Sequence, residues 1–149
     1  DLTHNTALAT VYCPNNRLTA LDLSKNTALA TLACSRNQLT ALDLSQNTAI
    51  TELYCNNNQL AALDLSRNTA LTELYCNGNR LTTLDLSRNT ELTKIYCDDN
   101  PLTELNISNL SKIEEIVFGD NPEITVIANS QTVVSDEVRH YMDGKRKTP

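Results

Sequence analysis

The stretch Leu71-Thr72-Glu73-Leu74-Tyr75-Cys76-Asn77-Gly78-Asn79-Arg80-Leu81 is one copy of a unit that recurs every 21 residues along the chain. Its cysteine marks the period, because each of the five cysteines follows the previous one by 21 residues. They are Cys13, Cys34, Cys55, Cys76 and Cys97. A strict period in one residue type indicates that a single supersecondary unit has been copied. The sequence therefore predicts an array of stacked repeats in place of one central core.

The unit reads L-x-x-L-x-C-x-x-N-x-L, which resembles the leucine-rich-repeat signature with cysteine in one leucine position. Its asparagine marks the successive turns at Asn16, Asn37, Asn58, Asn79, Asn100 and Asn121, and Phe118 stands where a sixth cysteine would fall. We therefore expect a β-rich leucine-rich-repeat solenoid of about six turns over residues 1–130. The resemblance implies a right-handed curved coil with a parallel β-sheet on its concave face.

Alternation along Leu53-Tyr54-Cys55 places the leucine and the cysteine inside the coil and the tyrosine outside. The same alternation in the L-D-L-S half of each unit predicts a convex side of irregular or short extended segments, without helices. The expected inward columns begin at Leu8, Val11, Leu18, Leu21 and Leu23 and continue through their equivalents in each later unit.

The two ends of the chain depart from the repeat. Asp1-Leu2-Thr3 aligns with Asp22-Leu23-Ser24, so residue 1 falls within a unit and we expect the N-terminal cap of the array to be missing. Residues 131–149 are predicted to form a C-terminal cap or linker. A short helix is expected there, because Ser135 is a good N-cap, acidic residues follow it and Gly144 lies beyond its end.

Asparagine occurs twice in each unit, in the Asn16 column and again at Asn5, Asn26, Asn47, Asn68 and Asn89. A buried side-chain amide has both donors and acceptors, so it can pair loop backbone groups of its own turn and of the next. We interpret both columns as structural, and we expect Asn58→Leu to destabilise the array sharply.

Three interpretations of the cysteine column compete. Disulfides are disfavoured because in-register neighbours on a parallel sheet point the same way, and an odd number leaves one cysteine unpaired. Zinc is disfavoured because a straight file of single cysteines does not form a tetrahedron. Cysteine as a small buried hydrophobic residue is the favoured interpretation, so no metal or other cofactor is expected.

The cysteine column, with repeats such as Leu39-Thr40-Ala41-Leu42-Asp43-Leu44-Ser45-Gln46-Asn47, resembles the repeats of the internalin group of bacterial surface proteins. The resemblance covers residues 1 to about 121. It implies a secreted or wall-attached, adhesin-like bacterial protein that binds a host or neighbouring-cell ligand. The chain departs from that group in lacking an N-terminal cap domain and an L-P-x-T-G sorting motif.

The expected binding surface is the outward side of the concave sheet. Four of the five tyrosines lie in one outward column, with acidic and amide side chains beside it. Amphipathic aromatic residues rimmed by such groups are enriched at protein interfaces. The candidate ligand-binding residues are Tyr12, Tyr54, Tyr75, Tyr96, Glu52, Glu73, Lys94, Asn56, Asn77 and Asp98. The competing interpretation is that stacked tyrosines only stabilise neighbouring strands.

A second outward column, on the opposite wall, consists of Asp22, Asp43, Asp64 and Asp85. Like charges about 4.8 Å apart repel, so a partner is expected. The favoured candidates are the residues three places on, namely Lys25, Gln46, Arg67 and Arg88. A file of calcium ions is the alternative, although the glycine-rich calcium repeat is absent.

Charge and composition restrict the other functions. The net charge of -6 disfavours nucleic-acid binding, and the short basic run Lys145-Arg146-Lys147 does not change this. No run of about 18 apolar residues is present, so membrane insertion is not expected. His4 and His140 are not placed beside a nucleophile and an orienting acid, so no catalytic site is predicted.

The sequence thus predicts a non-enzymatic, monomeric binding module of a bacterial surface or secreted protein, with a protein or glycan ligand on the concave face. Two alternatives remain. The array is a structural spacer that displays another domain, or it is the recruiting half of a larger secreted effector enzyme.

Overall fold

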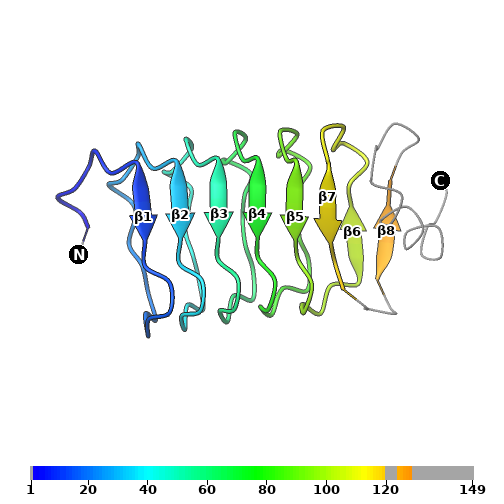
Figure 1. Cartoon of the computed structure of the whole chain (residues 1–149), viewed down its shortest axis with the longest axis horizontal. Helices are drawn as coiled ribbons and strands as arrows, with labels where there is room; N and C mark the ends of the chain where they lie inside the picture. The colour runs from blue at the N-terminus through cyan, green and yellow to red at the C-terminus, as the bar shows by residue number, and fades with distance from the viewer. Residues whose placement is uncertain (1, 120–123, 129–149) are drawn as a thin grey trace.

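The computed structural model describes residues 2–119 and 124–128, which form a coil of short parallel strands (Figure 1). Six strands make the main sheet, in the order β1-β2-β3-β4-β5-β7, and two make a second sheet, β6-β8. The main-sheet strands are β1 (Thr10–Tyr12), β2 (Thr31–Ala33), β3 (Glu52–Tyr54), β4 (Glu73–Tyr75), β5 (Lys94–Tyr96) and β7 (Glu115–Val117). The second sheet contains β6 (Glu104–Asn106) and β8 (Thr125–Ile127).

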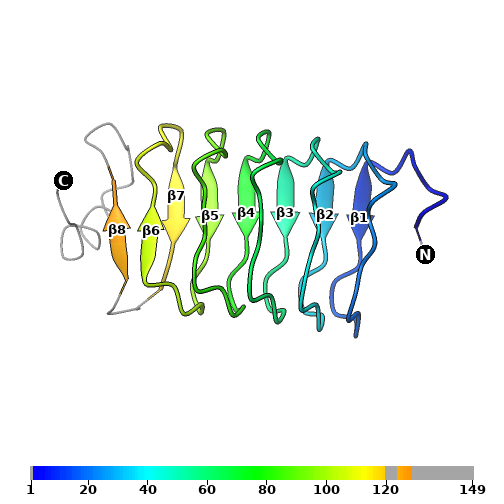
Figure 2. The same ribbon diagram turned by 180° about the vertical axis from the view of Figure 1, so that it is seen from behind.

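In Figure 1 the main-sheet strands run downward on the near side, and the chain returns upward behind them as it advances to the right, so the coil is right-handed; Figure 2 shows the same coil from behind. The described residues contain no helix, in agreement with the solenoid predicted for the array. The helix predicted after Ser135 and the predicted boundary near residue 130 lie outside the described residues.

The register of the main sheet follows the repeat period. Leu53 of β3 pairs with Leu32 of β2 and with Leu74 of β4, each 21 residues away. Residues of equal phase therefore form straight columns, as the sequence predicts. This register is forced, because a slip of one residue would turn every buried leucine toward solvent.

The predicted inward columns form the core. Leucine and cysteine of the middle turns are fully buried, among them Leu53, Leu74, Cys55 and Cys76, each with 0% exposure. In the first turn, Leu8, Leu18 and Leu21 are only partly buried, since the described residues cover only one of their two sides with a neighbouring turn. Burial therefore comes from stacking between neighbours, which is the source of stability in a repeat array.

The wall opposite the main sheet is mostly irregular. Strand pairing between turns occurs there only for β6 and β8 within the part of the chain that the structure describes. In β6 the aspartate of the repeat is replaced by Asn106, which pairs with Ile127. Directly opposite like charges destabilise a sheet. The uncharged pair Asn106–Ile127 thus allows a ladder that the aspartate column disfavours in earlier turns.

The asparagines of the Asn16 column join successive turns, in part as predicted. Asn58 Nδ2 donates to the carbonyl of Cys55 in its own turn, at 3.0 Å, and to that of Cys34, at 3.1 Å. Asn58 Oδ1 accepts from the backbone N–H of Leu39, at 3.1 Å. Cys34 and Leu39 belong to the preceding turn, so the predicted partner in the next turn is wrong. The Asn58 amide reaches back because the preceding turn has no backbone acceptor for the N–H of Leu39.

The second asparagine column also holds the preceding turn. Asn47 Nδ2 donates to the carbonyls of Leu23 and Asn26, at 3.0 and 2.9 Å. Asn26, Asn47, Asn68 and Asn89 are completely buried. Both columns therefore close backbone groups that no strand reaches. The second column uses only its Nδ2 donors, because the buried Oδ1 atoms of Asn26, Asn47, Asn68 and Asn89 have no hydrogen-bond partner among the described residues, so the predicted use of the acceptor holds for the Asn16 column alone.

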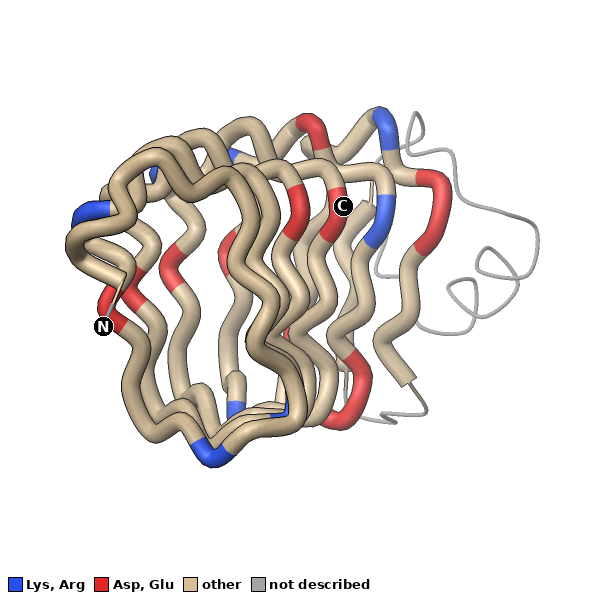
Figure 3. Tube along the Cα trace, turned by 60° about the vertical axis from the view of Figure 1, so that its left-hand side comes forward, with Lys and Arg blue, Asp and Glu red and all other residues tan. Residues whose placement is uncertain are grey.

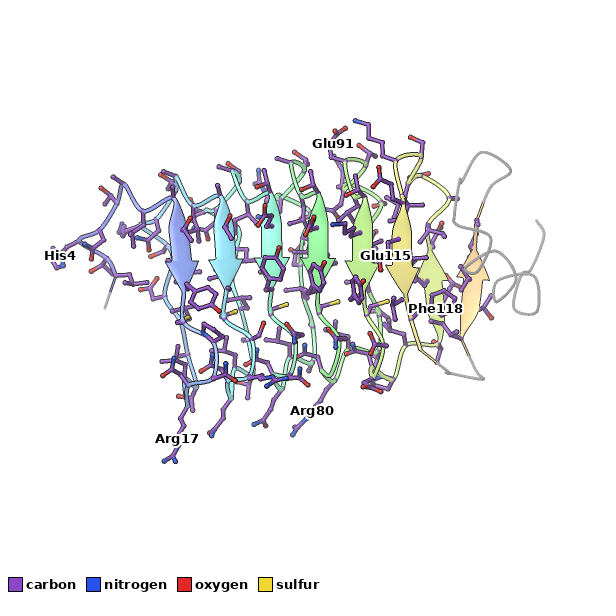
Figure 4. All side chains as sticks on the ribbon, viewed as in Figure 1. His4, Arg17, Arg80, Glu91, Glu115 and Phe118 are labelled. Carbon is purple, nitrogen blue, oxygen red and sulfur yellow. The ribbon has the colours of Figure 1, made fainter. Side chains whose placement is uncertain are left out.

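All five cysteines are free thiols, as predicted. Cys34, Cys55, Cys76 and Cys97 are buried, and Cys13 in the first turn is partly exposed. Figure 4 shows sulfur atoms following one another along the row of main-sheet strands. Burial raises the pKa of Cys34 and of Cys97 to about 12. The reactive thiolate is therefore scarce at neutral pH in these side chains.

Alkylation is expected to distinguish the first turn from the others. With iodoacetamide at mildly alkaline pH, Cys13 should react in the folded protein and the other four cysteines should be protected. Peptide mass mapping measures this site by site. Titration of the denatured, unreduced protein should then give five sulfhydryls. Fewer sulfhydryls, or equal labelling of Cys13 and Cys76 in the folded protein, would contradict a buried and unpaired file.

Candidate functional site

The outward side chains of the main sheet form a continuous surface, which we call the main face. It contains the ten residues predicted as ligand-binding. Tyr12, Tyr54, Tyr75, Tyr96, Glu52, Glu73 and Lys94 lie on strands β1, β3, β4 and β5, and Asn56, Asn77 and Asp98 lie two residues beyond three of these strands. Alternation along each strand turns these side chains away from the buried leucines. The structure brings most of them together but leaves Tyr12 apart.

Three tyrosines on adjacent strands form one stack. The ring centroids of Tyr54 and Tyr75 are 4.8 Å apart, and those of Tyr75 and Tyr96 are 4.6 Å apart. The interplanar angles are 25° and 11°. These distances match the spacing of neighbouring strands, so the sheet itself sets the stack. Both faces of the Tyr75 ring are covered, and the exposed parts of the stack are ring edges and hydroxyl groups.

Carboxylates hold the hydroxyl ends of this stack. The Tyr54 hydroxyl donates to Glu73 at 3.2 Å and lies 3.4 Å from Glu52 Oε2. The Tyr96 hydroxyl donates to Glu115. That hydrogen bond is the main cause that raises the pKa of Tyr96 to about 12. Burial, followed by Glu52 and Glu73, raises the pKa of Tyr54 well above its usual range.

One cationic side chain, that of Lys94, lies among the glutamates of the main face. Lys94 Nζ lies 2.9 Å from Glu73 Oε1 on the neighbouring strand, and this contact raises the pKa of Lys94. Lys94 also stands between Glu73 and Glu115 in the register of the sheet. The ion pair is partly exposed, so its contribution to stability is small. It nevertheless neutralises Glu73 and leaves the charge on the main face unevenly distributed.

Glu115 is a member of this network that was not among the predicted site residues. It lies in the same column as Glu52 and Glu73, and its partner Tyr96 lies one strand before it. The repeat itself was the available signal, because Glu73 stands in the same relation to Tyr54.

A further row of main-face side chains, Asn56, Asn77 and Asp98, lies in the loops that follow the strands. Asn56, Asn77 and Asp98 are partly buried, and burial raises the pKa of the Asp98 carboxyl group. The next residue in each turn has a positive φ, and it is Gly78 in the fourth turn. A Cβ added to Gly78 would lie 2.6 Å from Asn57 Oδ1. The loops are therefore packed against one another and hold this row rigidly.

Each aspartate of the column on the opposite wall accepts a hydrogen bond from a backbone N–H of its own turn (Asp and Glu positions are red in Figure 3). Asp43 Oδ1 accepts from the backbone N–H of Ser45 at 2.9 Å, and this bond is the main cause that lowers the pKa of Asp43. The predicted basic residues make no close ion pair with this column, since the ion pairs of the described residues are Lys94–Glu73 and Lys112–Glu91. They do act at longer range, because Lys25, Arg67 and Arg88 each help to lower the pKa of the aspartate three residues before them.

Shallow grooves separate the turns on this opposite wall. One of about 300 Å³ is lined by Thr82, Leu84, Asp85, Thr103 and Asn106, among others. No three His, Cys, Asp or Glu side chains of the described residues converge on a metal-binding position. His4 is exposed in the first turn (Figure 4), and His140 lies outside the described residues. The groove near Asp85 is lined mainly by hydroxyl, amide and apolar side chains.

A search for membrane spans among the described residues finds no helix long and apolar enough to cross a bilayer.

Charged side chains are also spread along the rims of the coil. Arg17 and Arg80 project from one rim, and Glu91 lies at the other (Figure 4). Arg80 donates to Gln59 of the preceding turn at 3.0 Å. This rim contact is exposed.

Comparison with known proteins supports this fold and its subclass. A family described as leucine-rich repeats (2 copies) matches residues 48–88. The functional domain of InlJ (internalin J) from Listeria monocytogenes, which includes a cysteine ladder, is similar in sequence and structure. The identity is 37%, the TM-score is 0.76, and the match covers 89% of this chain and 32% of that one. A search of curated proteins finds no significant match.

Two further solved structures share the fold. A leucine-rich-repeat protein of Leptospira interrogans has a TM-score of 0.80 at 19% identity, covering 99% of this chain and 44% of that one. An internalin, InlF, from Listeria monocytogenes has a TM-score of 0.76 at 22% identity, covering 91% and 43%. This chain therefore spans less than half the length of each. Taken with the repeat and the buried cysteine column, these similarities identify the chain as an internalin-like leucine-rich-repeat protein.

Proposed function

We propose that this chain is a non-enzymatic binding module of a bacterial surface or secreted protein, and that its main face binds a protein partner in an adhesin-like role. The observation that carries the proposal is the ordered stack Tyr54–Tyr75–Tyr96 with carboxylates at its hydroxyl ends. Tyrosine combines a large apolar area with a polar end and loses little conformational entropy on binding. A surface held in place before binding also reduces the entropic cost of association.

A protein partner fits this geometry better than a glycan. A sugar ring is usually bound by stacking on an open aromatic face, but both faces of Tyr75 are covered by its neighbours. The exposed ring edges, hydroxyls and carboxylates suit side chains and backbone N–H groups of a protein. Binding of a glycan in place of a protein would be detected in the same experiment.

A spacer is the second candidate, because the main face satisfies much of its own chemistry. The tyrosines contact one another, and Lys94 pairs with Glu73. Cross-strand pairs of this kind each contribute about 0.2–1 kcal/mol to a sheet. In a spacer the stack would serve only stability, and its loss would leave binding unchanged.

Substitution of the central tyrosine separates the two functions. We expect Tyr75→Ala to weaken partner binding by at least about tenfold, as for a truncated interface hot spot. Purified protein is assayed against a panel of extracellular protein domains and, in parallel, against a glycan array. Tyr75→Phe, which keeps the stack, and Asp43→Asn on the opposite wall are the matched controls.

The outcomes are distinct. Protein binding that is lost with Tyr75→Ala but kept with Asp43→Asn supports the proposal. The proposal is contradicted if a partner protein binds the Tyr75→Ala and Tyr54→Ala variants as tightly as it binds the unmodified chain. It is also contradicted if the unmodified chain binds no member of the panel, and that result favours the spacer. Ligands found only on the glycan array contradict the protein partner.

A further inference from the structure

The loops that follow β1, β2, β3 and β4 form one rim of the coil, and every charged side chain on it is an arginine. We call residues 15–17, 36–38, 57–59 and 78–80 the arginine rim. Arg17, Arg36 and Arg80 are exposed, and Figure 4 shows Arg17 and Arg80 pointing away from the coil. The other residues of the rim are asparagine and glutamine, with Gly78 as the exception. The rim thus presents three cations among amide groups, and its sequence contains no acidic and no apolar side chain.

The positive charge of the arginine rim is not compensated within the part of the chain that the structure describes. The ion pairs there, Lys94–Glu73 and Lys112–Glu91, include no residue of the rim. Cations of the opposite wall differ, since Arg67 and Arg88 each help to lower the pKa of an aspartate. The rim therefore keeps a local positive charge over four turns, although the net charge of the chain is -6.

Arg36 has a backbone conformation that disfavours arginine. Its φ is 54°, in the left-handed region. The equivalent residues of the other turns also have positive φ, and they are Asn15, Asn57, Gly78 and Asp99. Asparagine, aspartate and glycine adopt this conformation most readily. Arg36 is exposed and forms neither of the two ion pairs, so no such pair offsets the strain. Strain of this kind points to a role for the side chain.

The rim holds its arginines in a fixed, nearly straight row. The backbone N–H of Arg36 donates to the carbonyl of Asn56 at 2.9 Å, and that of Arg80 donates to the carbonyl of Leu60 at 2.9 Å. The side chain of Arg80 donates to Gln59 of the preceding turn at 3.0 Å. Turns are about 4.8 Å apart, so the row from the first to the fourth turn is about 14 Å long. Such a row suits an extended ligand with repeated negative charges.

We propose that the arginine rim is a second binding surface, separate from the main face, and that its ligand is an anionic polysaccharide. The guanidinium groups donate paired N–H groups to carboxylate or sulfate groups of the ligand. The amides of Gln38 and Asn57 donate to sugar hydroxyls and accept from them. The polysaccharide runs parallel to the axis of the coil from the first to the fourth turn. It ends before the fifth turn, where Asp99 would repel it.

Other anionic macromolecules fit the rim less well. A protein interface usually has apolar or aromatic anchors at its centre, and the rim residues include none. Single-stranded nucleic acids stack their bases on aromatic side chains, which are also missing from the rim. A polysaccharide needs neither, because its hydroxyls and charged groups are satisfied by amides and arginines.

The test uses a heparin oligosaccharide as a sulfated probe and an oligogalacturonate as a carboxylated one. Dextran is the neutral control, and poly-glutamate is the acidic peptide control. By calorimetry, at least one anionic polysaccharide should bind at least about tenfold more tightly than both controls, and added salt should weaken this binding. Either probe supports the proposal, and their comparison separates sulfate from carboxylate recognition. The proposal is overturned if neither polysaccharide binds or if poly-glutamate binds as tightly.

Two double variants locate the binding. Replacing Arg17 and Arg80 together by glutamine should weaken the bound polysaccharide at least about tenfold. Replacing Arg67 and Arg88 together by glutamine removes the same charge from the opposite wall, and it should change the affinity by less than about twofold. Equal losses in the two double variants would show attraction to cations in general and would overturn the rim as a site.

Arg36→Asn distinguishes a binding role from a purely structural one. Asparagine is better suited to the positive φ, so the melting temperature should rise. The affinity for the polysaccharide should nevertheless fall, because one guanidinium group is lost. A variant that gains stability and keeps its full affinity would overturn the assignment of Arg36 to the binding surface.

The main face and the arginine rim are tested independently. Tyr75→Ala should leave the affinity for the polysaccharide unchanged, whatever its effect on a protein partner. If polysaccharide binding is lost with Tyr75→Ala but kept in the variants of Arg17 and Arg80, the ligand lies on the main face and the rim proposal is wrong.

Discussion

Replacing Asn58 by leucine is expected to lower the free energy of unfolding by about 3 to 5 kcal/mol, which is a large part of the stability of a small array. The substitution removes the side-chain acceptor of the Leu39 N–H, which is buried and donates to no backbone carbonyl of the described residues. It also removes one of the two amide donors that reach the carbonyls of Cys34 and Cys55. The stranded N–H is the larger loss, because each carbonyl keeps one donor.

Urea denaturation measures this change, and Asn16→Leu is the matched control. Asn16 is exposed, and its amide donates only within its own turn, to Cys13 and Pro14 at 3.0 and 3.1 Å. Its replacement should reduce stability by less than about 1 kcal/mol. Hydrogen exchange provides a local check, since the Leu39 amide should lose its protection in Asn58→Leu. Equal effects of the two substitutions would show that the amides do not carry the contacts between turns.

The parts of the fold that could be predicted are those set by a single period. Leu53, Tyr54 and Cys55 alternate with period two, so their directions follow from the sequence alone. The repeat of 21 residues then fixes which residues pair across the sheet. Burial of the leucine and cysteine columns follows from these two facts, and so does the outward direction of the tyrosine column.

Details that depend on a choice between equivalent neighbours could not be predicted. Asn58 has a turn on each side, and only the three-dimensional path shows that it bonds to the preceding one. Lys94 lies between Glu73 and Glu115, and the pattern does not say which carboxylate it joins. The structure pairs it with Glu73, and the Tyr96 hydroxyl takes Glu115.

Strongly alkaline solution is expected to unfold the array through its buried thiols. Burial raises the pKa of Cys34 and Cys97 to about 12 and that of Cys55 and Cys76 well above the ordinary value of 9.0. A group whose pKa is higher in the folded state stabilises fully below its unfolded pKa and loses that contribution as pH rises toward the folded value. The stability of the array should therefore be flat up to about pH 8.5 and then fall.

The size of the effect follows from the same linkage. At pH 10, each buried thiol that ionises only on unfolding removes about 1.5 to 2 kcal/mol, so four of them remove roughly 6 to 8 kcal/mol. Urea unfolding midpoints measured between pH 7.5 and pH 10 check this estimate. The tyrosines and Lys94 also have raised pKa values, so a comparison between variants is needed to isolate the thiols.

Single substitutions provide that comparison. Cys76→Ala removes one buried thiol and leaves the tyrosines, Lys94 and the other cysteines in place. Between pH 7.5 and pH 10, its free energy of unfolding should therefore fall by about 1.5 to 2 kcal/mol less than that of the unmodified chain. Cys13→Ala is the control, because Cys13 is partly exposed. Its thiol contributes less, and its curve should stay nearly parallel to that of the unmodified chain. If the Cys76→Ala curve were also parallel, the thiols would ionise freely in the folded state. Such ionisation requires water inside the coil, so the same result would contradict the dry cysteine column on which the packing of the turns depends.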